Sequence, residues 1–151
     1  MKIRRDFVTN SSSSSFIVHF KNKQEREEGY KYLCRHYSKE LADFIFTDIA
    51  NNKKTYTETL KFLEEHIEGD ARRQIIYFTP KYEHKDFEWR YSAECKNLIK
   101  EKVDKDIKYF KESTNHRGYF AIVEYSDHTH SELEHDIMPN LPFVEKVFSH
   151  H

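Results

Sequence analysis

Tyr119-Phe-Ala-Ile-Val-Glu-Tyr125 is the stretch of this sequence that decides the fold, because it is the most convincing β-strand in the chain. It consists largely of β-branched and aromatic residues, and Gly118 ends the connection before it. Both features are typical of a strand. A second stretch, Phe16-Ile-Val-His-Phe20, alternates as a largely buried strand does. We therefore expect a sheet that contains these two strands.

Outward from these strands, the spacing of apolar residues predicts helices. The first covers about residues 23–46, with a break near Ser38. The second covers about residues 55–68, and Gly69 is expected to end it because glycine is common just after a helix. The third covers about residues 92–112. The sequence thus predicts about three main helices.

The remaining segments complete the predicted order of elements. Strands are expected at residues 73–79 and 143–148, and a short helix at 131–138. Residues 81–91 are interpreted as either a strand or a surface loop. Consecutive helices and an irregular alternation with strands favour an α+β fold. We expect a two-layer sandwich, with a small mixed or mostly antiparallel sheet of four to five strands and about three helices.

Length and composition restrict the class of protein. The chain has 151 residues, which fits a single domain over 1–151 with a Ser-rich lead-in segment at 1–15. Its 25 basic and 26 acidic residues nearly balance, which disfavours nucleic acid or an anionic membrane as partner. No run of about 18 apolar residues occurs, so we expect no membrane insertion. Cys34 and Cys95 lie in helical patterns, which predicts reduced thiols and a cytoplasmic location.

Chemistry-capable side chains concentrate directly after the 119–125 strand. Five of the ten histidines occupy the last 24 residues, mixed with carboxylates, and these groups bind metals and transfer protons near neutral pH. If the strand continues extended, alternate residues there point to the same side. One hypothesis is that this segment binds a divalent transition metal such as zinc, and that Glu132 or Glu134 acts as the catalytic base. The ligands would be His128, His130, His135 and Asp127.

The alternative interpretation of this histidine cluster is a solvated, charged loop. The cluster contains no His-Glu-x-x-His motif and no paired cysteines, so the metal signal is weak. The terminal His150 and His151 are either native or the remnant of an expression tag. We expect them to reach the cluster only if the closing strand lies beside residues 119–125.

Residues 81–91 combine aromatic rings with basic side chains, the composition of a binding hot spot. The predicted partner-binding residues are Tyr82, Phe87, Trp89, Arg90 and Tyr91. Stacking on single-stranded nucleic acid is the alternative. Acidic residues at 83, 86 and 88 interrupt any basic stripe, so a protein interface or an ordinary aromatic edge of the core is favoured.

The serine tract Ser11 to Ser15 is interpreted as an ordered loop or strand lead-in. A phosphate-binding nest is the alternative, but the tract contains neither glycine nor lysine. The segment Asp6-Phe-Val-Thr-Asn-Ser-Ser-Ser-Ser-Ser-Phe-Ile resembles the opening of a loose group of uncharacterised bacterial and phage proteins. The endings Leu133-Glu-His135 and Phe148-Ser-His-His151 are similar to those of some members. The resemblance implies a bacterial or phage context and no catalytic residue.

From these observations we predict a small intracellular binding or regulatory protein that docks onto a protein partner through an aromatic surface. A phage-borne origin fits the resemblance. The alternative is a metal-dependent hydrolase that uses the His/Asp/Glu cluster at residues 127–135. Nucleic-acid binding is the least favoured function because the charge is balanced.

Overall fold

The computed structural model describes residues 13–82 and 84–150. Residues 1–12 of the predicted lead-in segment, Glu83 and His151 lie outside the described residues. Within the part that is described, no helix combines the length and the apolar character needed to cross a membrane.

The chain divides into two compact units. We call Met1–Thr59 together with Thr114–His151 the sheet unit, and Leu60–Ser113 the helical unit. The prediction of a single domain over residues 1–151 stays a prediction. Cys34 and Cys95 are both free, as their positions in helical patterns predicted.

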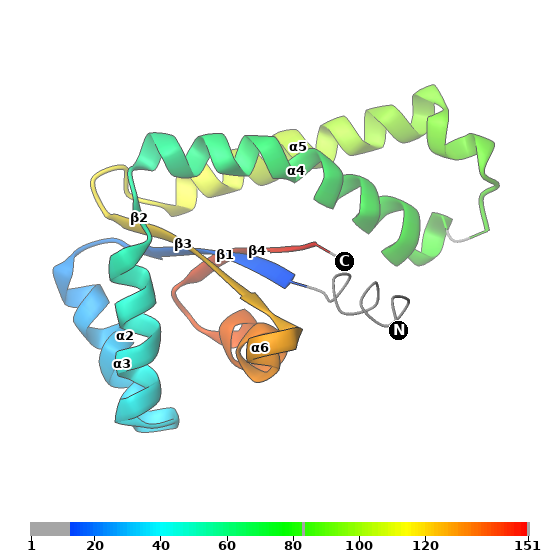
Figure 1. Ribbon diagram of the computed structural model, residues 1–151. Helices are drawn as coiled ribbons and strands as arrows, with labels where there is room; N and C mark the ends of the chain where they lie inside the picture. The colour runs from blue at the N-terminus through cyan, green and yellow to red at the C-terminus, as the bar shows by residue number, and fades with distance from the viewer. Residues whose placement is uncertain (1–12, 83, 151) are drawn as a thin grey trace. The chain divides into compact units, whose positions relative to one another are not determined.

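The sheet unit is built on four antiparallel strands, as Figure 1 shows. The strands are β1 (Ser13–Phe20), β2 (Lys53–Lys54), β3 (Tyr119–Ser126) and β4 (Val144–Ser149). Their order in the sheet is β2-β3-β1-β4, so β1 pairs with both β3 and β4. The α+β class and the number of strands are confirmed. The two-residue strand β2 was not predicted, because two residues are too few to show a periodicity.

Two helices, α2 (Lys23–His36) and α3 (Lys39–Asn51), pack on the sheet and form its apolar core. The predicted break is present at Ser38, whose Oγ accepts a hydrogen bond from the backbone N–H of Leu41 at 3.1 Å and caps α3. After β3 the chain enters the short helix α6 (Asp127–Glu132). The core joins alternate residues of β1 and β3 to the helices: Phe16, Val18, Phe20, Leu33, Ala42, Ile45, Ile49, Ala121 and Val123.

The helical unit contains most of α4 (Tyr56–Phe78) and all of α5 (Ala93–Ser113). Helix α4 runs through Gly69, so the predicted end at Gly69 and the predicted strand at residues 73–79 are both wrong. The physical reason is tertiary packing, which overrides local propensity. Ile75 and Ile76 of the expected strand are buried with residues of α5, in a core of Ala71, Ile75, Ile76, Cys95 and Ile99, whereas Tyr77 and Phe78 are exposed.

The connection between α4 and α5 contains no strand among its described residues. It forms two short 3-10 turns, Pro80–Tyr82 and Glu88–Tyr91, so the loop interpretation of residues 81–91 was the nearer one. The described part of the chain has five α-helices, α2 to α6, where about three were predicted. The count is higher because residues 23–46 form two helices divided at the predicted break, and because α6 forms at Asp127–Glu132. The short helix expected at residues 131–138 is found mainly as a π-helical turn, Leu133–Ile137.

Candidate functional site

Large aromatic side chains are exposed at the end of α4 and in the turns that follow it. Tyr77, Phe87 and Tyr91 are 60%, 63% and 58% exposed. Two arginines lie between these rings. We call Arg72, Tyr77, Phe87, Arg90 and Tyr91 the aromatic surface. All five residues belong to the helical unit.

Arg90 connects the rings of the aromatic surface. Its guanidinium carbon lies 4.9 Å from the centre of the Tyr77 ring and 5.4 Å from that of Phe87, and one guanidinium nitrogen donates to the Tyr77 hydroxyl at 3.1 Å. The Phe87 and Tyr91 rings meet edge to face, with centres 5.4 Å apart. Arg72 lies over Tyr91 at 5.4 Å and donates to the carbonyl of Arg90 at 3.3 Å. These contacts hold exposed side chains in one arrangement.

The five predicted partner-binding residues divide into two groups. Phe87, Arg90 and Tyr91 belong to the aromatic surface. Tyr82 and Trp89 stack on each other with ring centres 5.1 Å apart, and they are partly buried against the core of the helical unit. They therefore support the turn that carries the exposed residues.

Sequence reasoning missed Tyr77 and Arg72 as members of this surface. It placed Tyr77 in a strand, where nothing connects it to residues 87–91. Only the continuation of α4 to Phe78 brings the Tyr77 hydroxyl within hydrogen-bond distance of Arg90. The available signal was helical spacing that continues past Gly69, from Ala71 to Ile75.

A second candidate site lies in the sheet unit, around the buried carboxylate of Glu134. Asp127, Glu134 and His135 each offer one ligand atom, and these atoms lie within 4.8 Å of one another. Glu134 lies in a π-helical turn, Leu133–Ile137, and its side chain is 0% exposed. One carboxylate oxygen is 3.1 Å from Nε2 of His135, and the other accepts a hydrogen bond from the hydroxyl of Ser14 at 2.8 Å. We call these four residues the Glu134 cluster.

Three of the predicted residues, His128, His130 and Glu132, do not join the Glu134 cluster. They are exposed on α6, which begins at Asp127, so the condition that the strand continues extended is not met. The backbone of His130 is not helical (φ −141°, ψ 55°), so α6 is kinked at this residue. The ring of His130 instead packs near Tyr125, with ring centres 5.6 Å apart.

Tyr125 lies at the end of β3 and is buried. Its hydroxyl donates a hydrogen bond to the carboxylate of Asp48 at 2.7 Å. Burial, together with this hydrogen bond, raises the pKa of Tyr125 above the usual value for tyrosine. The hydroxyl therefore stays protonated and connects β3 to α3 as a structural donor.

The terminal histidine His150 lies on the opposite face of the sheet from the Glu134 cluster. The closing strand β4 pairs with β1 and not with β3, so the condition for reaching residues 127–135 is not met. Nε2 of His150 is 2.9 Å from the hydroxyl of Ser15 and 3.9 Å from a carboxylate oxygen of Glu124. Ser14 and Ser15 point to opposite faces because side chains alternate along a strand.

The described part of the serine tract, Ser13 to Ser15, belongs to β1, which confirms the strand lead-in interpretation for these residues. Strand β1 is paired on both sides here, so its backbone amides are used in the sheet. No anion-binding nest forms at these three residues. Ser11 and Ser12 lie outside the described residues.

Comparison of the chain with models of known protein families, with curated proteins and with solved structures finds no match.

Proposed function

We propose that this chain is a protein-binding module that docks onto a partner through the aromatic surface of the helical unit. The observation that carries the proposal is the continuous exposure of Tyr77, Phe87 and Tyr91, each more than half exposed, around the guanidinium of Arg90. Contiguous exposed apolar patches are uncommon on proteins that act alone and mark interaction surfaces.

The composition of the surface suits a high-affinity contact. Tyrosine and arginine are enriched among the residues that contribute most to binding, and aromatic rings bury a large area at a small cost in conformational entropy. The contacts of Arg90 with Tyr77 and Phe87 already restrict these side chains before a partner arrives. Such preorganisation reduces the entropy lost on binding.

The charges of the surface indicate the chemistry of the partner. Among the described residues, neither Arg72 nor Arg90 forms an ion pair with a carboxylate. Their hydrogen bonds go to the carbonyl of Arg90 and the hydroxyl of Tyr77, which are neutral acceptors. A guanidinium binds a carboxylate through two parallel hydrogen bonds. We therefore expect the partner to present acidic side chains beside an apolar contact.

The test is a capture experiment with matched variants. The chain is immobilised, exposed to a lysate of the source organism, and the retained proteins are identified by mass spectrometry. The double variant Phe87→Ala, Tyr91→Ala removes two rings of the surface. Tyr109→Ala is the control, because Tyr109 is 66% exposed on α5 and lies outside the surface.

A partner that docks on this surface is retained by the wild type and by the control and is lost with the double variant. Residues of this kind contribute about 2 kcal/mol or more each, which is about thirtyfold in affinity for each ring. Loss of both rings is therefore expected to weaken binding by up to about a thousandfold if their contributions add. If every retained protein binds the double variant as well as the wild type, the aromatic surface is not the docking site.

The second candidate function is a metal-dependent hydrolase centred on the Glu134 cluster. The observation in its favour is the convergence of Asp127, Glu134 and His135, two carboxylates and an imidazole, which together suit zinc or manganese. Such an ion lowers the pKa of its bound water and supplies a nucleophile. This function ranks second because both oxygens of Glu134 already have partners, in Ser14 and His135.

The metal hypothesis is tested on untagged protein by elemental analysis and by titration with zinc and manganese. His135→Ala removes a ligand of the Glu134 cluster. His128→Ala is the matched control, because His128 is exposed on α6 outside the cluster. The hypothesis requires stoichiometric metal in the wild type and the control and its loss in His135→Ala. Protein that retains no stoichiometric metal is not a hydrolase of this kind.

A further inference from the structure

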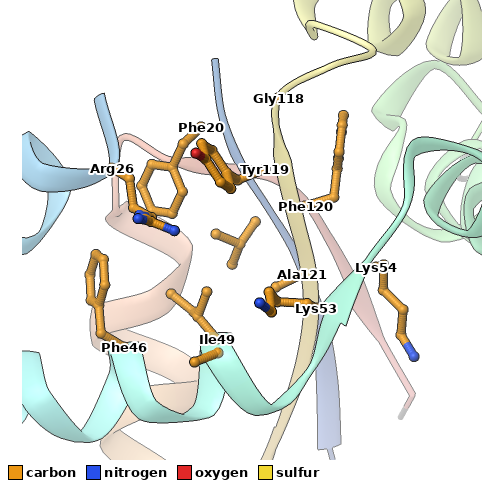
Figure 2. Close-up of a pocket in the computed structure, with 12 residues that line it drawn as sticks. Phe20, Arg26, Phe46, Ile49, Lys53, Lys54, Gly118, Tyr119, Phe120 and Ala121 are labelled. Atoms are coloured by element: carbon orange, nitrogen blue, oxygen red, sulfur yellow. The ribbon is translucent and has the colours of Figure 1, made fainter. Parts of the chain in front are cut away.

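The sheet unit contains a pocket that belongs to neither candidate site, shown in Figure 2. Its volume is about 290 Å³, near the lower end of the range in which proteins bind small molecules. All of its lining residues come from the sheet unit. The pocket therefore shares no residue with the aromatic surface.

The interior of the pocket is apolar. Strands β1 and β3 and helix α3 contribute its walls, which consist of aliphatic and aromatic side chains from Val18, Phe20, Phe46, Ile49, Phe120 and Ala121. Phe20 and Phe46 pack together with ring centres 5.8 Å apart, so part of the wall is a rigid aromatic surface. An apolar ligand body gains free energy by leaving water for such a surface.

The rim of the pocket is cationic. Arg26, Lys53 and Lys54 line it, and none of the described lining residues is acidic. The Arg26 guanidinium carbon lies 4.4 Å from the centre of the Tyr119 ring. Figure 2 shows this guanidinium directed toward the middle of the pocket, whereas the Lys54 ammonium points away from it.

Arg26 and Lys53 are the cations available to a ligand. Lys54 interacts with Glu58, whose pKa is lowered mainly by hydrogen bonds from Thr55 and also by the charge of Lys54. Among the described residues, neither Arg26 nor Lys53 lies within ion-pair distance of a carboxylate. The pocket thus combines an apolar interior with two cations that pair with no carboxylate in the described part of the chain.

We propose that this pocket binds a small amphipathic organic anion. The ligand places a planar, apolar body against Phe20, Phe46 and Ile49 and pairs a carboxylate or phosphate group with Arg26 and Lys53. Opposite charge at the rim selects the anion, and the volume limits the body to about one fused pair of aromatic rings. A guanidinium already stacked on a ring is well placed to bind a planar or tetrahedral oxyanion with two hydrogen bonds.

The test uses three probes that share one apolar body: 2-naphthyl phosphate, 2-naphthoate and neutral 2-naphthol. Each is titrated into the ¹⁵N-labelled full chain, and binding is followed through the amide signals of Ala50, Gly118 and Ala121, which line the pocket. We expect saturable shifts of these signals with at least one of the two anions and binding at least about tenfold weaker with naphthol. The stronger anion shows whether the site prefers a carboxylate or a phosphate.

Two variants locate the binding. Arg26→Gln removes the central cation and is expected to weaken binding of the preferred anion by about tenfold. Its matched control is Arg35→Gln, an exposed arginine on the same helix α2 and outside the pocket, which should bind as the wild type does. Ala50→Trp places a large ring at the exposed edge of the pocket and is expected to abolish binding.

Three outcomes would overturn the proposal: no saturable binding of either anion, equal binding of naphthol, or equal effects of Arg26→Gln and Arg35→Gln. Circular dichroism of each variant separates loss of binding from loss of folding. If Arg26→Gln is unfolded, Lys53→Gln serves as the second test of the charge, because Lys53 is exposed on β2.

Discussion

Replacing Ser14 by alanine removes the hydroxyl that donates a hydrogen bond to the carboxylate of Glu134 at 2.8 Å. Both groups are buried, since Ser14 is 3% exposed and the Glu134 side chain is 0% exposed. Hydrogen bonds to charged groups contribute about 1.5–3 kcal/mol, and a buried acceptor left without its donor is costly. We expect Ser14→Ala to lower the free energy of unfolding by about 1.5–3 kcal/mol.

The assay is urea unfolding at neutral pH, followed by circular dichroism, on a double-mutant cycle. Glu134→Met replaces the carboxylate by an apolar side chain of similar length that adapts to its surroundings. In that background the Ser14 hydroxyl has lost its charged acceptor, so Ser14→Ala should cost less than about 0.5 kcal/mol. The coupling energy of the cycle then reports the hydrogen bond alone.

Equal costs of Ser14→Ala in the two backgrounds would refute this reasoning. The hydroxyl would then stabilise the sheet through something other than Glu134, such as its 3.3 Å contact with the Ser149 hydroxyl. A large coupling energy would instead show that the serine tract and the histidine-rich segment stabilise each other, although they are 120 residues apart in the chain.

Three further predictions follow from packing, backbone geometry and helix capping. Leu33→Ala should lower the free energy of unfolding by about 2–5 kcal/mol in urea, because Leu33 is fully buried in the core. Gly118→Ala should be destabilised by more than about 1 kcal/mol in the same assay, because the added Cβ would lie 2.5 Å from the Phe20 carbonyl oxygen. Hydrogen bonds from Thr55 hold the pKa of Glu58 below the usual value for glutamate. The ionised carboxylate therefore stabilises the fold fully at pH values above the usual pKa, and this stabilisation is lost as the pH falls through the lowered pKa of the folded state. Thr55→Ala removes the side-chain hydrogen bond but keeps the backbone N–H, which donates to the Glu58 carboxylate at 2.9 Å and is the larger cause. The pKa of Glu58 should therefore rise only partway toward its usual value in an NMR titration, and a full return to that value would contradict the role of the backbone N–H.

The sequence by itself determined the elements whose patterns are local. The strands at residues 16–20, 119–125 and 143–148 and the helix at 92–112 agree with the structure to within a few residues. In these segments apolar residues recur with the period of a strand or of a helix, because one face of each element is buried. This periodicity can be read directly from the sequence. The break at Ser38 was predictable for the same reason, because a capping serine acts within one turn.

Tertiary contacts determined the secondary structure of segments whose local sequence patterns were ambiguous. Residues 73–78 have the composition of a strand, yet they continue α4. The reason is that Ala71, Ile75 and Ile76 pack against apolar residues of α5. That continuation also creates the aromatic surface by placing Tyr77 beside Arg90.

The Glu134 cluster also depends on tertiary contacts that local sequence patterns do not predict. Residue type and position after the strand at 119–125 identified Asp127, Glu134 and His135 as candidates, but the same criteria selected His128, His130 and Glu132 as well. The helix that begins at Asp127 turns those two histidines out of the cluster, and the pairing of β1 with β3 and β4 brings Ser14 to Glu134. Residue types and the periodicity of apolar residues can be read from the sequence. Contacts between segments that are distant in the sequence depend on how helices and strands pack to bury their apolar faces.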